Sequence, residues 1–107
     1  MHDNIRREIE TTIDVIKRFP EIEKIILFGS LATETGHNDS DIDLLLVRNN
    51  NWQSKRALLK KIRNILPSQT FPLDLVLMND DEVSELLASP NSVVSEAINH
   101  GKILYER

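Results

Sequence analysis

Carboxylates that interrupt two apolar segments are the residues of this chain best suited to chemistry. Asp41 and Asp43 stand two apart at the start of the apolar stretch 42–47, and Asp74 interrupts the stretch 73–78. Because side chains alternate across a β-strand, this spacing predicts that Asp41 and Asp43 point to the same face. Aspartate is uncommon in strands, and like charges on neighbouring strands repel one another unless a cation lies among them. The pattern therefore favours a metal site made of Asp41, Asp43 and Asp74.

A hard divalent cation fits this set of ligands. Mg²⁺ binds carboxylate oxygens and shares its coordination sphere with substrate phosphates. In two-metal enzymes a pair of such ions, about 3.5–4 Å apart, activates an attacking hydroxyl and stabilises the leaving oxygen. We expect Mg²⁺ as the cofactor, with two ions bound and with Mn²⁺ able to substitute.

Gly29 and Ser30 directly follow the apolar stretch 24–28 and are candidates for phosphate binding. A glycine at the end of a strand lets backbone amides approach a phosphate closely, and a serine hydroxyl adds a donor. A Gly-Ser pair alone is usually only a turn, and Asp74 alone could protect an edge strand from aggregation. Phosphate binding in one loop and metal binding on the following strand are the two parts that nucleotidyl transfer requires. We interpret them as one site.

Short strands and amphipathic helices must position these residues. Apolar stretches rich in β-branched and aliphatic residues predict strands at 24–28, 42–47 and 73–78, and 103–105 predicts a last short extended segment. Helical spacing and helix-ending signals predict helices over 5–16 and 53–66, another from 79, and one from Ser89-Pro90. Ile65 is one of the apolar positions of the helix over 53–66, and Ile98 is placed on the buried side of the helix that starts at Ser89-Pro90. The order predicts an α/β (α+β) domain with a small mixed sheet packed with helices.

Composition and charge narrow the class of protein. The chain has 107 residues, of which 40% are hydrophobic and 28% charged, and it contains no cysteine. Zinc fingers, disulfide scaffolds and thiol nucleophiles are thereby excluded. Its 13 basic and 17 acidic residues give a formal charge of −4, so we expect no direct binding of nucleic acid. The length predicts one domain over residues 1–107. No apolar run approaches the ~18 residues of a membrane span, so we expect a cytoplasmic protein without membrane contact.

These motifs together resemble the nucleotidyltransferase superfamily related to DNA polymerase β. The resemblance is carried by Gly29-Ser30, ten intervening residues, Asp41-Ile42-Asp43-Leu44 and the later strand with Asp74. The chain is similar to the smallest branch, the minimal nucleotidyltransferases, which includes antitoxins of the MntA type encoded beside a HEPN-domain toxin. The resemblance implies the polymerase β-like fold. It also implies that Gly29 and Ser30 bind the nucleotide, and that Asp41, Asp43 and Asp74 are catalytic and bind the metals.

The same resemblance implies an activity and a partner. The chain is expected to transfer AMP from ATP to a hydroxyl side chain of a HEPN-domain RNase toxin and thereby to neutralise it. Since 107 residues leave no room for an acceptor domain, we expect the acceptor on a second polypeptide. Many relatives carry Arg or Lys and then Gly where this chain has Thr33 and Glu34. Two alternatives stay open: a non-catalytic antitoxin that covers its partner, and a small-molecule adenylyltransferase whose acceptor site spans a homodimer.

Overall fold

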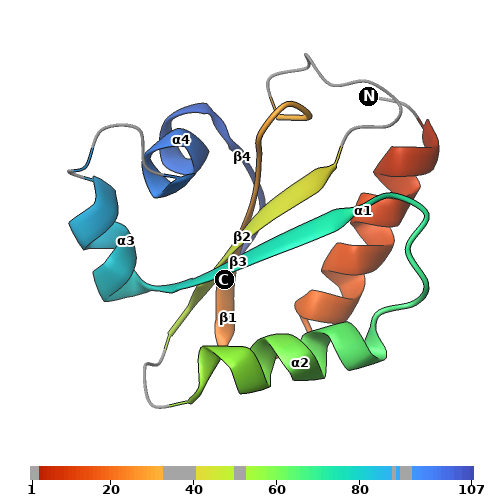
Figure 1. Cartoon of the computed structure of the whole chain (residues 1–107), viewed down its shortest axis with the longest axis horizontal. Coiled ribbons are helices and arrows are strands. Elements are labelled where there is room, and N and C mark those ends of the chain that lie inside the picture. The colour runs from red at the N-terminus through yellow and green to blue at the C-terminus, as the bar shows by residue number, and fades with distance from the viewer. Residues whose placement is uncertain (1–2, 33–40, 50–52, 88, 90–92) are drawn as a thin grey trace.

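Helices and strands alternate along the chain in the computed structural model, which describes residues 3–32, 41–49, 53–87, 89 and 93–107 (Figure 1). The described elements are α1 (Asp3–Ile16), β1 (Ile22–Phe28), β2 (Ile42–Arg48), α2 (Lys55–Ile65), β3 (Leu73–Asn79), α3 (Asp80–Leu87), α4 (Val93–His100) and β4 (Lys102–Glu106). Their order and types are those predicted from the sequence, with ends that differ by a few residues. The predicted helix start at Pro90 lies outside the described residues. Within the described ranges, no helix is long and apolar enough to cross a membrane.

The strands form one mixed sheet in the order β3-β2-β1-β4. Strand β1 runs antiparallel to both β2 and β4, whereas β2 and β3 run parallel. A mixed sheet was predicted, and this topology confirms it. The parallel register pairs Asp43 with Asp74, and the antiparallel register pairs Phe28 with Asp43. The end of β1 and the starts of β2 and β3 therefore lie at the same end of the sheet.

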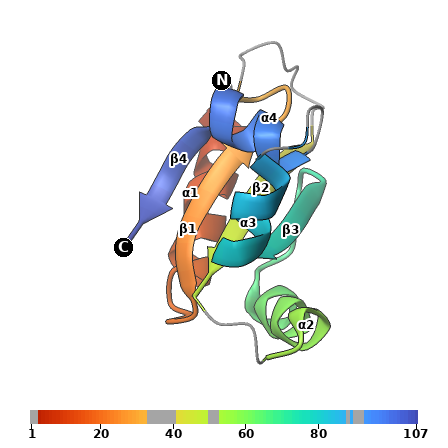
Figure 2. The ribbon, with the colours of Figure 1, turned by 90° about the vertical axis from the view of Figure 1, so that its left-hand side faces the viewer.

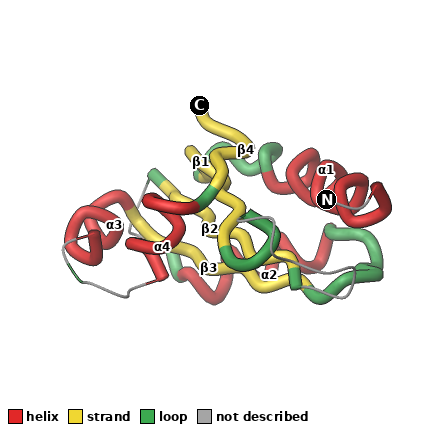
Figure 3. Tube along the Cα trace, turned by 90° about the horizontal axis from the view of Figure 1, so that it is seen from above, coloured by secondary structure: helices red, strands yellow, loops and turns green. Residues whose placement is uncertain are grey.

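Helices cover both faces of the sheet, with α3 and α4 in front of it and α1 behind it in Figure 2. Seen from above, the strands lie between α3 and α4 on one side and α1 on the other (Figure 3). The alternation of side chains along β2 divides its residues between the two faces. Ile42, Leu44 and Leu46 join the cluster that also contains residues of α1 and α2, while Leu45 and Val47 join a second cluster with Ala97 of α4.

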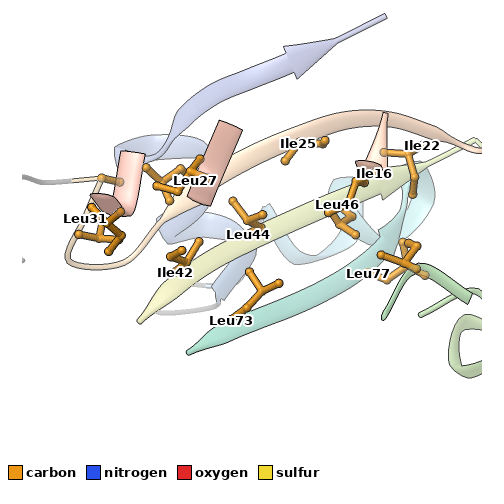
Figure 4. Close-up of a cluster of buried hydrophobic side chains, with 14 of the residues drawn as sticks. Ile16, Ile22, Ile25, Leu27, Leu31, Ile42, Leu44, Leu46, Leu73 and Leu77 are labelled. Carbon is orange, nitrogen blue, oxygen red and sulfur yellow. The ribbon is translucent and has the colours of Figure 1, made fainter. Parts of the chain in front are cut away.

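The larger core lies between the sheet and the pair α1 and α2 (Figure 4). Helix α1 contributes Ile5, Ile9 and Ile16, and α2 contributes Leu58 and Ile62. Burial of one such side chain contributes about 1.5–3 kcal/mol. Because this cluster holds more buried residues than the cluster on the other face, it supplies most of the apolar stabilisation.

Two apolar side chains, one on α2 and one on α4, are exposed, and that of Ile98 was wrongly predicted to be buried. Ile65 is 51% exposed and Ile98 is 39% exposed. Ile65 is the last residue of α2, whose two buried residues are Leu58 and Ile62. In α4 the buried residue Ala97 faces the sheet. Because successive helical residues are about 100° apart, the next residue, Ile98, points away from the sheet.

A buried arginine ties together three segments at the other end of β2. The Arg48 side chain is embedded in the fold, with 3% relative exposure for the residue. Its Nε donates to Oδ1 of Asn79, and its Nη1 donates to the carbonyl of Gln53 at 2.5 Å. Next to it, Lys55 Nζ and Glu82 Oε2 form an ion pair at 2.5 Å. These contacts join the ends of β2 and β3 to the start of α2, and they fix the sheet at the end away from the aspartates.

Candidate active site

The carboxylates of Asp43 and Asp74 lie side by side at one end of the sheet. The two residues are direct partners in the parallel β2–β3 pair, so their side chains project from the same face. Burial raises the pKa of Asp43 first, and the two carboxyl groups are close enough that the charge of Asp74 raises it further. The face is the one that carries Leu45 and Val47, toward α4. Two carboxylates from separate strands, as predicted, therefore share one site.

Asp41 lies immediately before β2 and is exposed. Its charge acts on Asp43, so the two carboxylates are close in space as well as in sequence. Ile42 between them is fully buried in the α1/α2 core, on the opposite face from Asp43. This alternation is the one predicted from the spacing of the two aspartates.

The environment of Asp43 disfavours its charged form. Its pKa rises from 3.8 to about 6, first because the group is partly buried and then because Asp74 repels the charge and shares a hydrogen bond with it. Asp41 and Glu96 add smaller repulsions in the same direction. All of these neighbours are acidic, so the cluster gathers negative charge that a bound cation would neutralise.

Glu96 is a member of this cluster that the sequence did not reveal. It lies on α4, is exposed, and raises the pKa of Asp43 by charge repulsion. On the sequence it is one more acidic residue near the start of a helix. Only the packing of α4 beside β1 and β2 brings it near the two strand aspartates.

Gly29 packs its backbone directly against the Asp43 carboxylate. Its φ is 75°, in the left-handed region that favours glycine. A Cβ at this position would collide with Oδ2 of Asp43. Ser30 follows in a turn that is closed by a hydrogen bond of 3.1 Å from Ala32 N to Gly29 O. The predicted phosphate-binding pair therefore adjoins the aspartates, whereas Thr33 and Glu34 lie outside the described residues.

The donor chemistry of the site fits a hard divalent cation. Asp43 and Asp74 present carboxylate oxygens, which Mg²⁺ and Mn²⁺ prefer. Burial and then the neighbouring negative charges raise the pKa of Asp43, and a bound cation would compensate those charges. In the part of the chain that the structure describes, no three acidic or histidine side chains stand in metal-ligand geometry. Asp41 lies close to this pair, immediately before β2. The geometry brings together two of the predicted ligands and places the third nearby.

Comparison with known proteins identifies the fold. The family model described as Polymerase beta, Nucleotidyltransferase matches residues 10–107, and no curated protein matches the chain. A Sulfolobus solfataricus protein assigned as a nucleotidyltransferase aligns over 94% of this chain and 87% of its own, with 18% identity and a TM-score of 0.59.

Two further solved structures are toxin–antitoxin complexes. A chain of one, solved with AMP-PNP, has 23% identity and a TM-score of 0.55. A chain of the other, the tri-AMPylated Shewanella oneidensis HEPN toxin with its MNT antitoxin, has 19% identity and a TM-score of 0.50. Both alignments cover 94% of this chain and 73% of the other. At these identities the likeness establishes a shared fold, and together with the family match over residues 10–107 it shows that the chain belongs to the Polymerase beta nucleotidyltransferase family.

Proposed function

We propose that this chain transfers AMP from ATP to a hydroxyl side chain of a partner protein, in a reaction that depends on Mg²⁺. The observation that carries the proposal is the meeting of Gly29, Asp43 and Asp74 at one end of the sheet. It joins the phosphate-binding candidate to a pair of carboxylates on neighbouring strands. In the reaction, the acceptor oxygen bonds to the α-phosphorus of ATP, the α–β anhydride bond breaks, and pyrophosphate leaves.

The residues of the chain take separate parts in this reaction. The left-handed backbone at Gly29 leaves space for backbone amides to approach the triphosphate, and the exposed Ser30 offers a hydroxyl beside it. Asp41, Asp43 and Asp74 would hold two Mg²⁺ ions, whose positive charge favours departure of pyrophosphate. Asp74 is the proposed acceptor of the proton of the attacking hydroxyl, since its exposed carboxylate lies beside Asp43 on the neighbouring strand.

We further propose that the partner is a HEPN-domain toxin and that the chain is its antitoxin. Support comes from the similar structures, of which one is a toxin–antitoxin complex with AMP-PNP and another contains a tri-AMPylated HEPN toxin. A covalently added AMP carries a phosphate charge and a nucleoside onto the toxin, and it persists after the two proteins separate. Neutralisation would then outlast the complex.

Incubation of the purified chain with ATP, Mg²⁺ and a HEPN-domain protein encoded beside it tests the proposal. The intact mass of the partner should rise by one AMP for each hydroxyl modified. Asp43→Asn should abolish this gain, because transfer of this kind depends on metal charge and on positioning. Glu10→Gln is the matched control, since Glu10 is an exposed residue of α1 away from the aspartates, and it should modify the partner at the parent rate.

The alternative, an antitoxin that only covers its partner, predicts a different outcome. The parent chain and Asp43→Asn would then inhibit the toxin equally, and neither would change its mass. Toxin that regains activity on dilution of the complex would also contradict covalent transfer.

A further inference from the structure

We infer that Glu8 is a positioning residue for the proposed site: it fixes the segment 70–72, and through it the start of β3, so that Asp74 lies beside Asp43. The inference rests on the proposed function for its catalytic meaning. Its structural content depends only on the contacts of Glu8. Helix α1 lies on the opposite face of the sheet from the carboxylates, so Glu8 acts through the backbone of another segment.

The Glu8 carboxylate binds two successive backbone amides of that segment. Thr70 N donates to Oε1 at 2.8 Å, and Phe71 N donates to Oε2 at 2.7 Å. Thr70 and Phe71 lie 62 and 63 positions after Glu8 in the sequence. Hydrogen bonds to a charged acceptor are about twice as strong as those between neutral groups. These two hydrogen bonds link α1 directly to the segment that leads into β3.

The same segment is bonded on its other side to the aspartate strand. Ile42 N donates to the carbonyl of Pro72 at 2.8 Å, and Ile42 is the residue between Asp41 and Asp43. The register then continues with Ile42 opposite Leu73 and Asp43 opposite Asp74. One short segment is therefore held by Glu8 at 70–71 and by the site strand at 72, two residues before Asp74.

The position of β3 in the sheet makes such a link effective. Strand β3 is at the edge, and β2 is its only partner strand in the described sheet. An edge strand is held by a backbone hydrogen-bond ladder on one side only, so contacts at its ends add to its placement. Arg63 Nη2 adds a second contact at its start, a hydrogen bond of 3.2 Å to the carbonyl of Leu73. Together, Glu8 and Arg63 fix the end of β3 that carries Asp74.

Substitution of Glu8 tests the inference without relying on turnover. In Glu8→Gln one amide-accepting oxygen is replaced by an NH₂ group that cannot accept a hydrogen bond. The side chain lines an open surface cavity of about 260 Å³, so the isosteric change causes no clash. The measurement is NMR of the metal-free protein, which compares interstrand contacts at Asp43–Asp74 with those at Val47–Met78 in the same strand pair. The contacts at the aspartates should weaken, and those at the far end should remain.

Binding of Mn²⁺, measured by electron paramagnetic resonance, supplies the second readout. Glu8→Gln should lower the Mn²⁺ affinity about 10-fold, the lower end of the loss seen when groups that orient metal ligands are changed. Glu10→Gln changes the same charge on the same helix and should match the parent in both measurements. If Glu8→Gln does not fold, Glu8→Asp, which keeps the charge on a side chain shorter by one methylene, should show the same changes.

The outcomes separate this inference from the proposed function. Unchanged Asp43–Asp74 contacts in the Glu8 variant would overturn the positioning role. Failure of the parent chain to bind Mn²⁺ would overturn the proposed metal-dependent function, while the NMR contacts would still decide the role of Glu8. Weakened contacts with unchanged Mn²⁺ affinity would show that Glu8 is a structural residue of β3 and would also refute the inference.

Discussion

Replacement of Asp43 by asparagine should stabilise the metal-free protein, although Asp43 is central to the proposed activity. The folded state holds this carboxyl against Asp74 and near Asp41 and Glu96, with its pKa raised from 3.8 to about 6. Between these values the folded protein binds more protons at Asp43 than the unfolded chain does. The free energy of unfolding therefore falls as the pH rises from about 4 to about 6, and the loss persists above that window.

The size of this loss in the free energy of unfolding follows from the pKa of Asp43. At 1.36 kcal/mol per pH unit, a rise from 3.8 to about 6 corresponds to at most about 3 kcal/mol. Because Asp43 is only partly buried, screening by solvent reduces this to about 1–2 kcal/mol. An asparagine keeps an NH₂ group that can donate to Asp74 without the charge. For a chain of this size, we expect the melting temperature of Asp43→Asn at pH 7.5 to exceed that of the parent by about 5–10 °C.

Thermal melting followed by circular dichroism, in EDTA and from pH 3.5 to 8, measures the effect. The parent and Asp43→Asn should melt together near pH 3.5 and diverge through the window from 4 to 6. Glu10→Gln, which removes one exposed carboxylate from α1, controls for net charge and should follow the parent. Melting curves of Asp43→Asn that run parallel to the parent across the whole range would refute the electrostatic reasoning. In the parent alone, saturating Mg²⁺ should recover the lost stability at pH 7.5.

Three further substitutions test other contacts by urea unfolding. Gly29→Ala should lose about 1–3 kcal/mol, because its left-handed backbone is strained for alanine and the new Cβ collides with a carboxylate; an unchanged midpoint would contradict this. Arg48→Met should lose about 2 kcal/mol, since it leaves buried acceptors without their donor; a loss within error would show that the network is dispensable. The hydrogen bond from Lys55 lowers the pKa of Glu82, so Glu82→Gln should lose less than about 1 kcal/mol at pH 7. The stability difference between the parent and Glu82→Gln should decline as the pH falls below 4.5, the ordinary pKa of glutamate, and through the lowered pKa of Glu82. A difference that stays constant with pH would contradict this prediction.

Local patterns in the sequence predicted the elements and the faces of their residues. The isoleucine spacing identified α1, and Ile5, Ile9 and Ile16 are buried as that spacing requires. The two-residue spacing of Asp41 and Asp43 predicted their shared face, because a strand leaves a side chain no other alternation. Such patterns depend on the geometry of one segment, and they are readable without knowledge of the neighbours.

Contacts between distant segments could not be predicted in the same way. Nothing local sets the parallel register that places Asp74 opposite Asp43, or the packing of α4 that brings Glu96 close to them. Arg48 occupies a charged position at the end of a strand and would ordinarily be placed in solvent, yet it is buried because Asn79 and a backbone carbonyl accept its donors. The Glu8 contact joins segments 62 residues apart, and its partners are backbone amides that carry no sequence signal.

The two neighbours of β1 are synthesised at very different times. Its pairing with β2 is complete once residue 48 is made, whereas the pairing with β4 joins Lys24 to Glu106 and Ile25 to Tyr105. Closing so long a loop delays the second pairing and slows folding. Until residues 102–106 leave the ribosome, one edge of β1 keeps its backbone amides and carbonyls unpaired, and an unpaired strand edge is a template for other chains. The nascent chain therefore still exposes an unpaired edge of β1 after β3 has covered the edge of β2, until β4 is made.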